Sequence, residues 1–136
     1  MSNLPLPLPV SGSGYQVADG NKTEVTFFGR AQATVIAAAY TLTIADFAAG
    51  LIDATSSGSY ALTTPTAVLM DAGIVNAKLG ASFILNICHE SATNVITLTG
   101  GAGVTVVGLA TVTGIVGAQF MFRKTGDGAW SAYRVA

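Results

Sequence analysis

The sequence predicts a mainly β protein: an antiparallel β-sandwich or barrel with one or two short helices and an extended N-terminal arm. Short runs alternate polar and apolar residues at the period of a strand, as in N-V-I-T-L-T at 94–99. Glycine-rich turn signals separate such runs at intervals of roughly 8–12 residues, which is typical of antiparallel sandwiches and barrels. Residues 91–122 carry no charge. Polar hydroxyls interrupt this tract too often for a transmembrane helix of about 20 apolar residues.

The charge-free tract indicates strands whose outward faces carry hydroxyl and methyl groups. Charged residues make up 10% of the chain, against about 25% in an ordinary soluble domain. Hydrophobic residues make up 51%, and the mean hydropathy is +0.58. A chain of this composition is not expected to be disordered. We expect a subunit that hides much of its surface against other protein.

Charge and cysteine content restrict the partners and the compartment. The net charge of −1, with basic residues spread along the chain, predicts no nucleic-acid partner. The start, MSNLPLPLPV, lacks the basic segment and uninterrupted apolar run of a signal peptide. One cysteine excludes an internal disulfide and fits synthesis in a reducing cytoplasm. No membrane partner is expected.

The N-terminus reads as an arm joined to one domain. Residues 4–10, L-P-L-P-L-P-V, predict an extended and stiff segment, because proline fixes φ and disfavours a helical predecessor. Ser and Gly at 11–14 form a hinge, so the arm and hinge span 1–14 and a single β-rich domain spans 15–136. A disordered leader is the alternative. The interface reading places four side chains on a neighbouring subunit: Leu4, Leu6, Leu8 and Val10.

Two short helices are predicted among the first strands. Residues 44–52 follow Thr43 as N-cap, with Asp46 in the first turn. Residues 67–72 follow Pro65-Thr66 and are expected to end with Gly73 in the C′ position. The turn and strands expected in this half are 19–21 (turn), 22–28, one or two strands within 32–43, and 59–63.

The second half reads as strand and turn. The expected strands are 82–88, 95–99, 104–107, 111–115, 118–124 and 129–135. The Asp-Gly pair within 125–128 predicts a hairpin loop, and the glycines at 100–103 predict another hairpin turn. The latter loop lacks the lysine and hydroxyl of a phosphate-binding loop, and a strand follows it. No internal repeat with a period of about 20 to 50 residues is evident.

Candidate catalytic residues are few. Cys88, His89 and Glu90 are adjacent, but neighbours in a strand point to opposite faces. A metal site needs three or four ligands, and the chain has no second His or Cys. A structural role is therefore expected, with Cys88 as a buried small hydrophobe. The scattered acids neither support nor exclude a glycosidase pair. We expect no enzyme, cofactor or metal.

Three residues near the C-terminus are candidate interface residues: Arg123, Trp130 and Tyr133. They lie on two predicted strands joined by the Asp-Gly turn, and Trp, Tyr and Arg are enriched in interface hot spots. Core packing of Trp130 is the alternative.

Four segments resemble small virion proteins of tailed bacteriophages. They are YQVADGN at 15–21, TLTIADFAAGLI at 41–52, ITLTGGAGVTVVG at 96–108 and FMFRKTGDGAWSAYRV at 120–135. The chain is similar to head decoration (cement) proteins, and related segments occur in phage fibre or tail-associated proteins. The shared motifs are structural, so no catalytic residue is carried over.

The resemblance implies a β-rich homotrimer on the outer capsid surface, made in the bacterial cytoplasm and incorporated into the virion. Its partners would be the major capsid protein and itself, and its function would be capsid stabilisation by bridging capsid subunits. The alternative is a tail-fibre or spike module that binds a host surface receptor or glycan, which predicts an exposed aromatic cluster.

Overall fold

The computed structural model describes residues 30–55 and 57–136. The chain divides into two units, Met1–Arg30 and Ala31–Ala136, and every element below belongs to the second. The predicted arm and hinge at 1–14, the turn at 19–21 and the strand at 22–28 lie outside the described residues. The prediction of a mainly β fold with two short helices is confirmed.

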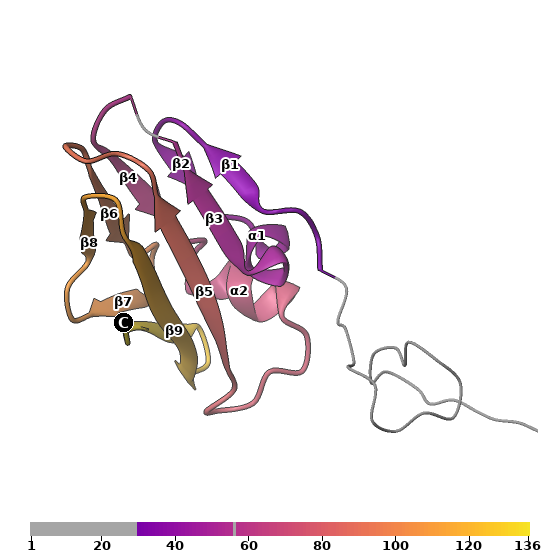
Figure 1. Ribbon diagram of the computed structural model, residues 1–136. Coiled ribbons are helices and arrows are strands. Elements are labelled where there is room, and N and C mark those ends of the chain that lie inside the picture. The colour runs from indigo at the N-terminus through magenta and orange to yellow at the C-terminus, as the bar shows by residue number, and fades with distance from the viewer. Residues whose placement is uncertain (1–29, 56) are drawn as a thin grey trace, which may run out of the picture. The chain divides into compact units, whose positions relative to one another are not determined.

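Among residues 30–55 and 57–136, ten strands form two open sheets (Figure 1). The six-stranded sheet contains, in spatial order, β1 (Thr34–Ile36), β3 (Leu51–Ala54), β5 (Ser82–His89), β9 (Gly117–Gly126), β10 (Ala129–Arg134) and β7 (Val104–Val107). The four-stranded sheet contains β2 (Tyr40–Thr41), β4 (Tyr60–Thr63), β6 (Val95–Thr99) and β8 (Thr111–Thr113). The helices are α1 (Ile44–Ala49) and α2 (Ala67–Gly73).

The sheets are mixed rather than purely antiparallel, and neither closes into a barrel. From β1 to β8 the chain alternates between the two sheets, so β1, β3 and β5 pair in parallel, as do β2, β4 and β6. A parallel pair needs a crossover of a dozen or more residues. Here each crossover contains a strand of the other sheet. The crossover from β1 to β3 also contains helix α1, and the crossover from β3 to β5 also contains helix α2.

A short sequence repeat occurs at the strands of the four-stranded sheet. Tyr-x-Leu-Thr occurs at 40–43 and again at 60–63, and Ile-Thr-Leu-Thr occupies 96–99. These segments include β2, β4 and β6, which are neighbours in the four-stranded sheet, and their leucines are buried. The repeated unit is only four residues, and unequal insertions separate its copies, so the similarity has no fixed period.

Aromatic rings from both strands and helices fill one end of the core. Phe83 on β5 pairs with Phe122 on β9, and their rings stack at a centroid distance of 5.2 Å. Phe47 of α1 packs on both rings at 4.9 Å. Trp130 of β10 is 1% exposed and lies 6.0 Å from the Phe83 ring. Core packing, the alternative considered for Trp130, is what the structure shows.

Helix α1 begins where the sequence predicts but ends earlier. Thr43 caps it with a complete capping box, in which Asp46 accepts a hydrogen bond from the Thr43 backbone N–H at 2.7 Å. Gly50 takes a left-handed conformation (φ 78°) directly after Ala49. The helix is shorter than the predicted 44–52, because Leu51 and Ile52 belong to β3.

Helix α2 is held on the β9–β10 hairpin by Asp71. Thr66 is its N-cap, as predicted, but Gly73 is the last helical residue rather than the residue after the end. Asp71 accepts hydrogen bonds from Trp130 Nε1 at 2.8 Å and from the Gly128 backbone N–H at 2.7 Å. Lys124 Nζ lies 3.1 Å from the same carboxylate.

The free energy of unfolding should decrease in acid because of the Asp71 carboxylate. The hydrogen bond from the Gly128 backbone, then those from Trp130 and Lys124, lower the pKa of Asp71 below its ordinary 3.8. A lowered folded-state pKa gives stability that is present above the unfolded value and lost as the pH falls through the folded value. We expect urea midpoints to be steady above about pH 5 and to drop below about pH 4. Asp71→Asn should show a smaller drop; an unchanged drop would contradict this assignment.

The glycine loop at 100–103 is not a hairpin turn, because it connects β6 in one sheet to β7 in the other. The loop packs against backbone. Gly101 donates its N–H to Thr64 Oγ1 at 2.8 Å. A Cβ on Gly103, whose φ is +82°, would stand 2.6 Å from the Gly128 carbonyl oxygen. Glycine is needed here for close approach between segments.

Gly103→Ala should lower the free energy of unfolding by about 2 kcal/mol or more, because it combines a positive φ with a backbone clash. Gly58→Ala is the matched control, since a Cβ there meets nothing within 4 Å. Chemical denaturation of both variants checks this. If the Gly103→Ala and Gly58→Ala variants were equally stable, the loop at 100–103 would accommodate a Cβ at no cost, which would contradict the prediction.

Candidate assembly surfaces

The predicted interface residues fall into three groups. Arg123 and Tyr133 project from the outer face of the six-stranded sheet, where Arg123 is exposed and Tyr133 half-buried. Trp130 lies in the core beneath that sheet, because it is out of phase with Tyr133 along β10. Leu4, Leu6, Leu8 and Val10 lie outside the described residues.

Strand pairing arranges the outer face of the six-stranded sheet in rows. One row is apolar and crosses four strands: Ile84, Met121, Tyr133 and Val107. On one side of it lies a polar row: Ser82, Arg123, Ser131 and Thr105. On the other side lie Leu51, Asn86 and Gln119, and beyond them Val35, Asp53, Cys88 and Gly117. The face is therefore a flat array of apolar, amide and hydroxyl side chains.

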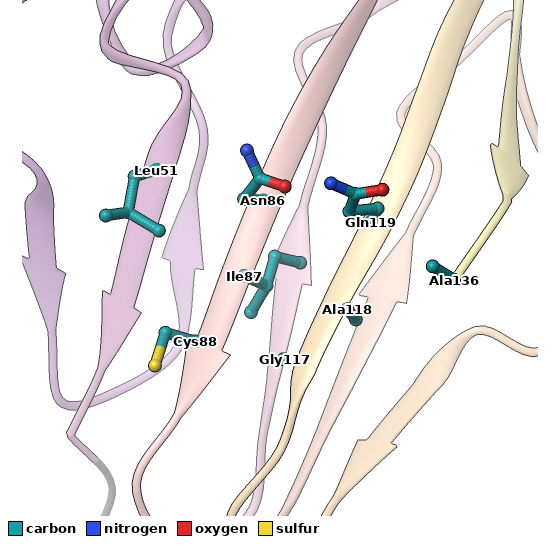
Figure 2. Close-up of a pocket in the computed structure, with 8 residues that line it drawn as sticks. All are labelled: Leu51, Asn86, Ile87, Cys88, Gly117, Ala118, Gln119 and Ala136. Atoms are coloured by element: carbon teal, nitrogen blue, oxygen red, sulfur yellow. The ribbon is translucent and has the colours of Figure 1, made fainter.

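A shallow hollow interrupts this face above β5 and β9 (Figure 2). Its volume is about 270 Å³, and its lining is Leu51, Asn86, Ile87, Cys88, Gly117, Ala118, Gln119 and Ala136. Gly117, which stands opposite Cys88, has no side chain to fill the space. The Asn86 amide is held by a hydrogen bond to the Gly50 carbonyl at 3.3 Å. The hollow can take an apolar side chain, with amides at its edge.

The two charged groups in these rows lie at opposite ends of the face. Arg123 lies in the row at one end, and Asp53 in the row at the other. Glu90 follows β5 beside Asp53, and their hydrogen bond and mutual charge raise the pKa of Glu90 above its ordinary 4.5. One end of the face is thus acidic and the other basic.

The outer face of the four-stranded sheet carries threonines. The buried partners along these strands are Leu62, Ile96, Leu98 and Val112, so the alternate residues point outward. Pairing aligns the outward side chains in two main rows: Thr41, Thr63 and Thr99, and then Ala61, Thr97 and Thr111. The paired outward residues of this sheet include no charge. The expected hydroxyl and methyl faces of the tract 91–122 are confirmed here.

An apolar hollow of about 260 Å³ lies where α1 and α2 meet β5. Its lining is Ile44, Phe47, Ala48, Gly73, Ile74 and Phe83. Hydrocarbon and aromatic groups make up this lining, so it offers no acid, base or nucleophile for catalysis.

The Cys88-His89-Glu90 segment does not assemble a catalytic cluster. His89 is 1% exposed and faces the core, whereas Cys88 is exposed on the outer face. The prediction that Cys88 is buried was wrong. Alternation along the strand places His89, rather than Cys88, on the inner face with Phe83, Leu85 and Ile87. Within residues 30–55 and 57–136, no three potential metal ligands of the Asp, Glu, His and Cys types group together.

The Asp53 and Glu90 carboxyl groups are the pair that most resembles an acid–base site. Hydrogen bonding and charge from Asp53 raise the pKa of Glu90, and the Glu90 backbone N–H donates to the carbonyl of Ala54, the residue after Asp53, at 3.1 Å. The two acids alone neither support nor exclude the glycosidase pair considered in the sequence.

In the part of the chain that the structure describes, no helix is long and apolar enough to cross a membrane. Comparisons of the chain with protein-family models, with curated proteins and with solved structures found no match. Functional inference therefore depends on the surfaces described above and on the resemblance noted in the sequence.

Proposed function

We propose that this chain is a structural, non-catalytic virion protein that decorates the outer surface of a phage capsid and bridges capsid subunits. The proposed partners are the major capsid protein and further copies of the chain, as a homotrimer. The resemblance to head decoration proteins supports this proposal.

The observation that carries the proposal is the pair of broad, charge-poor sheet faces. Such faces hold few charges to desolvate, so they suit contact with other protein, and burying their apolar area contributes about 25 cal/mol per Å². Single apolar side chains on a surface are ordinary. Here, however, Ile84, Met121, Tyr133 and Val107 form one continuous row, and a threonine array covers the other sheet.

A glycan-binding fibre module is less well supported. That function predicted an exposed aromatic cluster around Trp130, but the indole is buried and its Nε1–H is bonded to Asp71. The structure thus removes the observation that favoured this alternative.

Deleting residues 1–11 should abolish binding to purified expanded capsids while leaving thermal unfolding of the domain unchanged. The proposed reason is that Leu4, Leu6, Leu8 and Val10 bury apolar area on a neighbouring subunit. A full-length variant with these four residues changed to serine is the matched control, because it retains the prolines and the length. Wild-type capsid occupancy of both variants would overturn the arm mechanism.

A further inference from the structure

We propose that the outer face of the six-stranded sheet is a two-fold contact between two copies of this chain, in which Arg123 of each copy lies against Asp53 and Glu90 of the other. This contact goes beyond the proposed function, because it does not depend on where the copies are located. If the protein is a trimer, a two-fold contact would join neighbouring trimers rather than close one ring.

The charges of the face identify a second copy as the occupant. A two-fold contact is self-complementary, so a surface that uses it must carry its own counter-charge. Arg123 lies in one terminal row and Asp53 in the opposite one. Uncharged side chains fill the two rows between them. The two groups are about 20 Å apart in one chain, at 3.3 Å per residue and 4.8 Å per strand. They cannot pair within it.

The same spacing locates the two-fold axis. An axis that exchanges Arg123 and Asp53 crosses β5 between Ile84 and Asn86, near the centre of the face. It also brings Met121 and Tyr133 of the second copy over the hollow that Gly117 leaves empty. Apolar side chains then enter an apolar hollow while the charged ends meet.

The size of the face is adequate for a stable pair. Its strands cover a planar area of about 550 Å² at the usual strand spacings, and side chains increase the accessible area. Specific interfaces bury about 600–1,000 Å² on each partner. Within this area, Ile84, Leu51 and Val107 are 38%, 39% and 41% exposed, which leaves apolar surface for a second copy to cover.

The Asp53 and Glu90 carboxyl groups also favour a cationic partner. The Glu90 backbone N–H is bonded to the carbonyl of Ala54, next to Asp53, and the charge of Asp53 acts on Glu90, so the two carboxylates repel each other. A guanidinium from a second copy would relieve this repulsion and supply a planar fork of donors that suits carboxylates.

The decisive experiment mixes two charge-reversal variants of the full chain, Arg123→Asp and Asp53→Arg. Each variant alone places like charges against each other twice, so sedimentation equilibrium should show self-association weakened by about 100-fold relative to wild type. In an equimolar mixture, each mixed pair has one contact of wild-type sign, between Arg123 and Asp53, and one contact of reversed sign, between the two substituted residues. The mixture should therefore form mixed pairs with near wild-type affinity, detectable by native mass spectrometry.

Asp127→Arg is the matched control, because it makes the same charge change on a fully exposed side chain of the hairpin loop and should leave association unchanged. If Asp53→Arg does not fold, Glu90→Lys replaces it in the mixture, since Glu90 is exposed. A wild-type chain that stays monomeric at high concentration would overturn the proposal. So would single variants that associate like wild type, or a mixture that does not recover. None of these outcomes bears on capsid binding by the arm.

Discussion

Replacing Trp130 by alanine is expected to lower the free energy of unfolding by about 4 kcal/mol, the range measured for large aromatic residues in protein cores. The indole is 1% exposed and packs at the Phe83 ring. Its removal leaves a cavity between the sheet and α2, and it takes from Asp71 one of its hydrogen-bond donors. Guanidinium denaturation followed by circular dichroism measures the loss.

Trp130→Phe separates the two contributions. It keeps most of the apolar volume but lacks the Nε1–H, so we expect a loss of about 1–2 kcal/mol for the hydrogen bond to Asp71 Oδ1, which keeps Lys124 Nζ as its partner. A Trp130→Ala variant as stable as wild type would contradict the burial of the ring. Because this residue supports the fold, a loss of host adsorption in Trp130→Ala would report unfolding rather than a lost receptor contact.

Asp46→Ala should cost about 3 kcal/mol, because it removes several part-buried hydrogen bonds to a buried carboxylate together with the capping box of α1. Asp46 is 5% exposed and accepts hydrogen bonds from Thr34 Oγ1 at 2.6 Å and from Tyr40 at 3.0 Å, besides capping α1 through Thr43. Burial alone would raise the pKa of Asp46, but these hydrogen bonds together lower it below 3.8. The ionised carboxylate therefore joins β1, β2 and α1.

The control for Asp46→Ala is Asp127→Ala, an exposed acid whose loss should change stability by no more than about 0.5 kcal/mol. Asp46→Asn keeps the shape but not the charge, and we expect an intermediate loss. Both are measured by denaturant titration at neutral pH. If Asp46→Ala unfolds at the same denaturant concentration as Asp127→Ala, the carboxylate does not hold these elements together.

Local structure was predictable because it depends on neighbouring residues. The periodicity of 104–107 and 95–99 predicted two strands at the observed bounds, and Thr43 and Asp46 marked the start of α1 through capping chemistry. Its end at Gly50 was missed. The strand at 82–88 was also foreseen. Its phase gave the buried residues Leu85 and Ile87, but Cys88 was assigned to the wrong face.

Strand partners could not be derived from these local patterns. Sequential strands were expected to pair antiparallel, as β9 and β10 do through their Asp-Gly turn. The alternation of β1 to β8 between two sheets depends on long-range pairing, which no single segment encodes. The Tyr-x-Leu-Thr unit shared by 40–43 and 60–63 was the available signal for equivalent strands.

The candidate surface was predictable in its chemistry but not in its layout. A charge-free tract implied hydroxyl and methyl faces, and the threonine rows of β4, β6 and β8 bear this out. Alternation along β10 could separate Trp130 from Tyr133, but it could not say which of them faces solvent. The row from Ile84 to Val107 exists only through the register of four strands.

The number of copies per virion tests the proposed function most directly. On the proposal that a phage encodes this chain, it can be measured by quantitative mass spectrometry of that phage's purified virions, with the major capsid protein as internal standard. A protein that decorates the capsid surface should be present in hundreds of copies, in a fixed ratio to the capsid protein. A handful of copies would assign it to the tail, and its absence from the virion would contradict a structural role there.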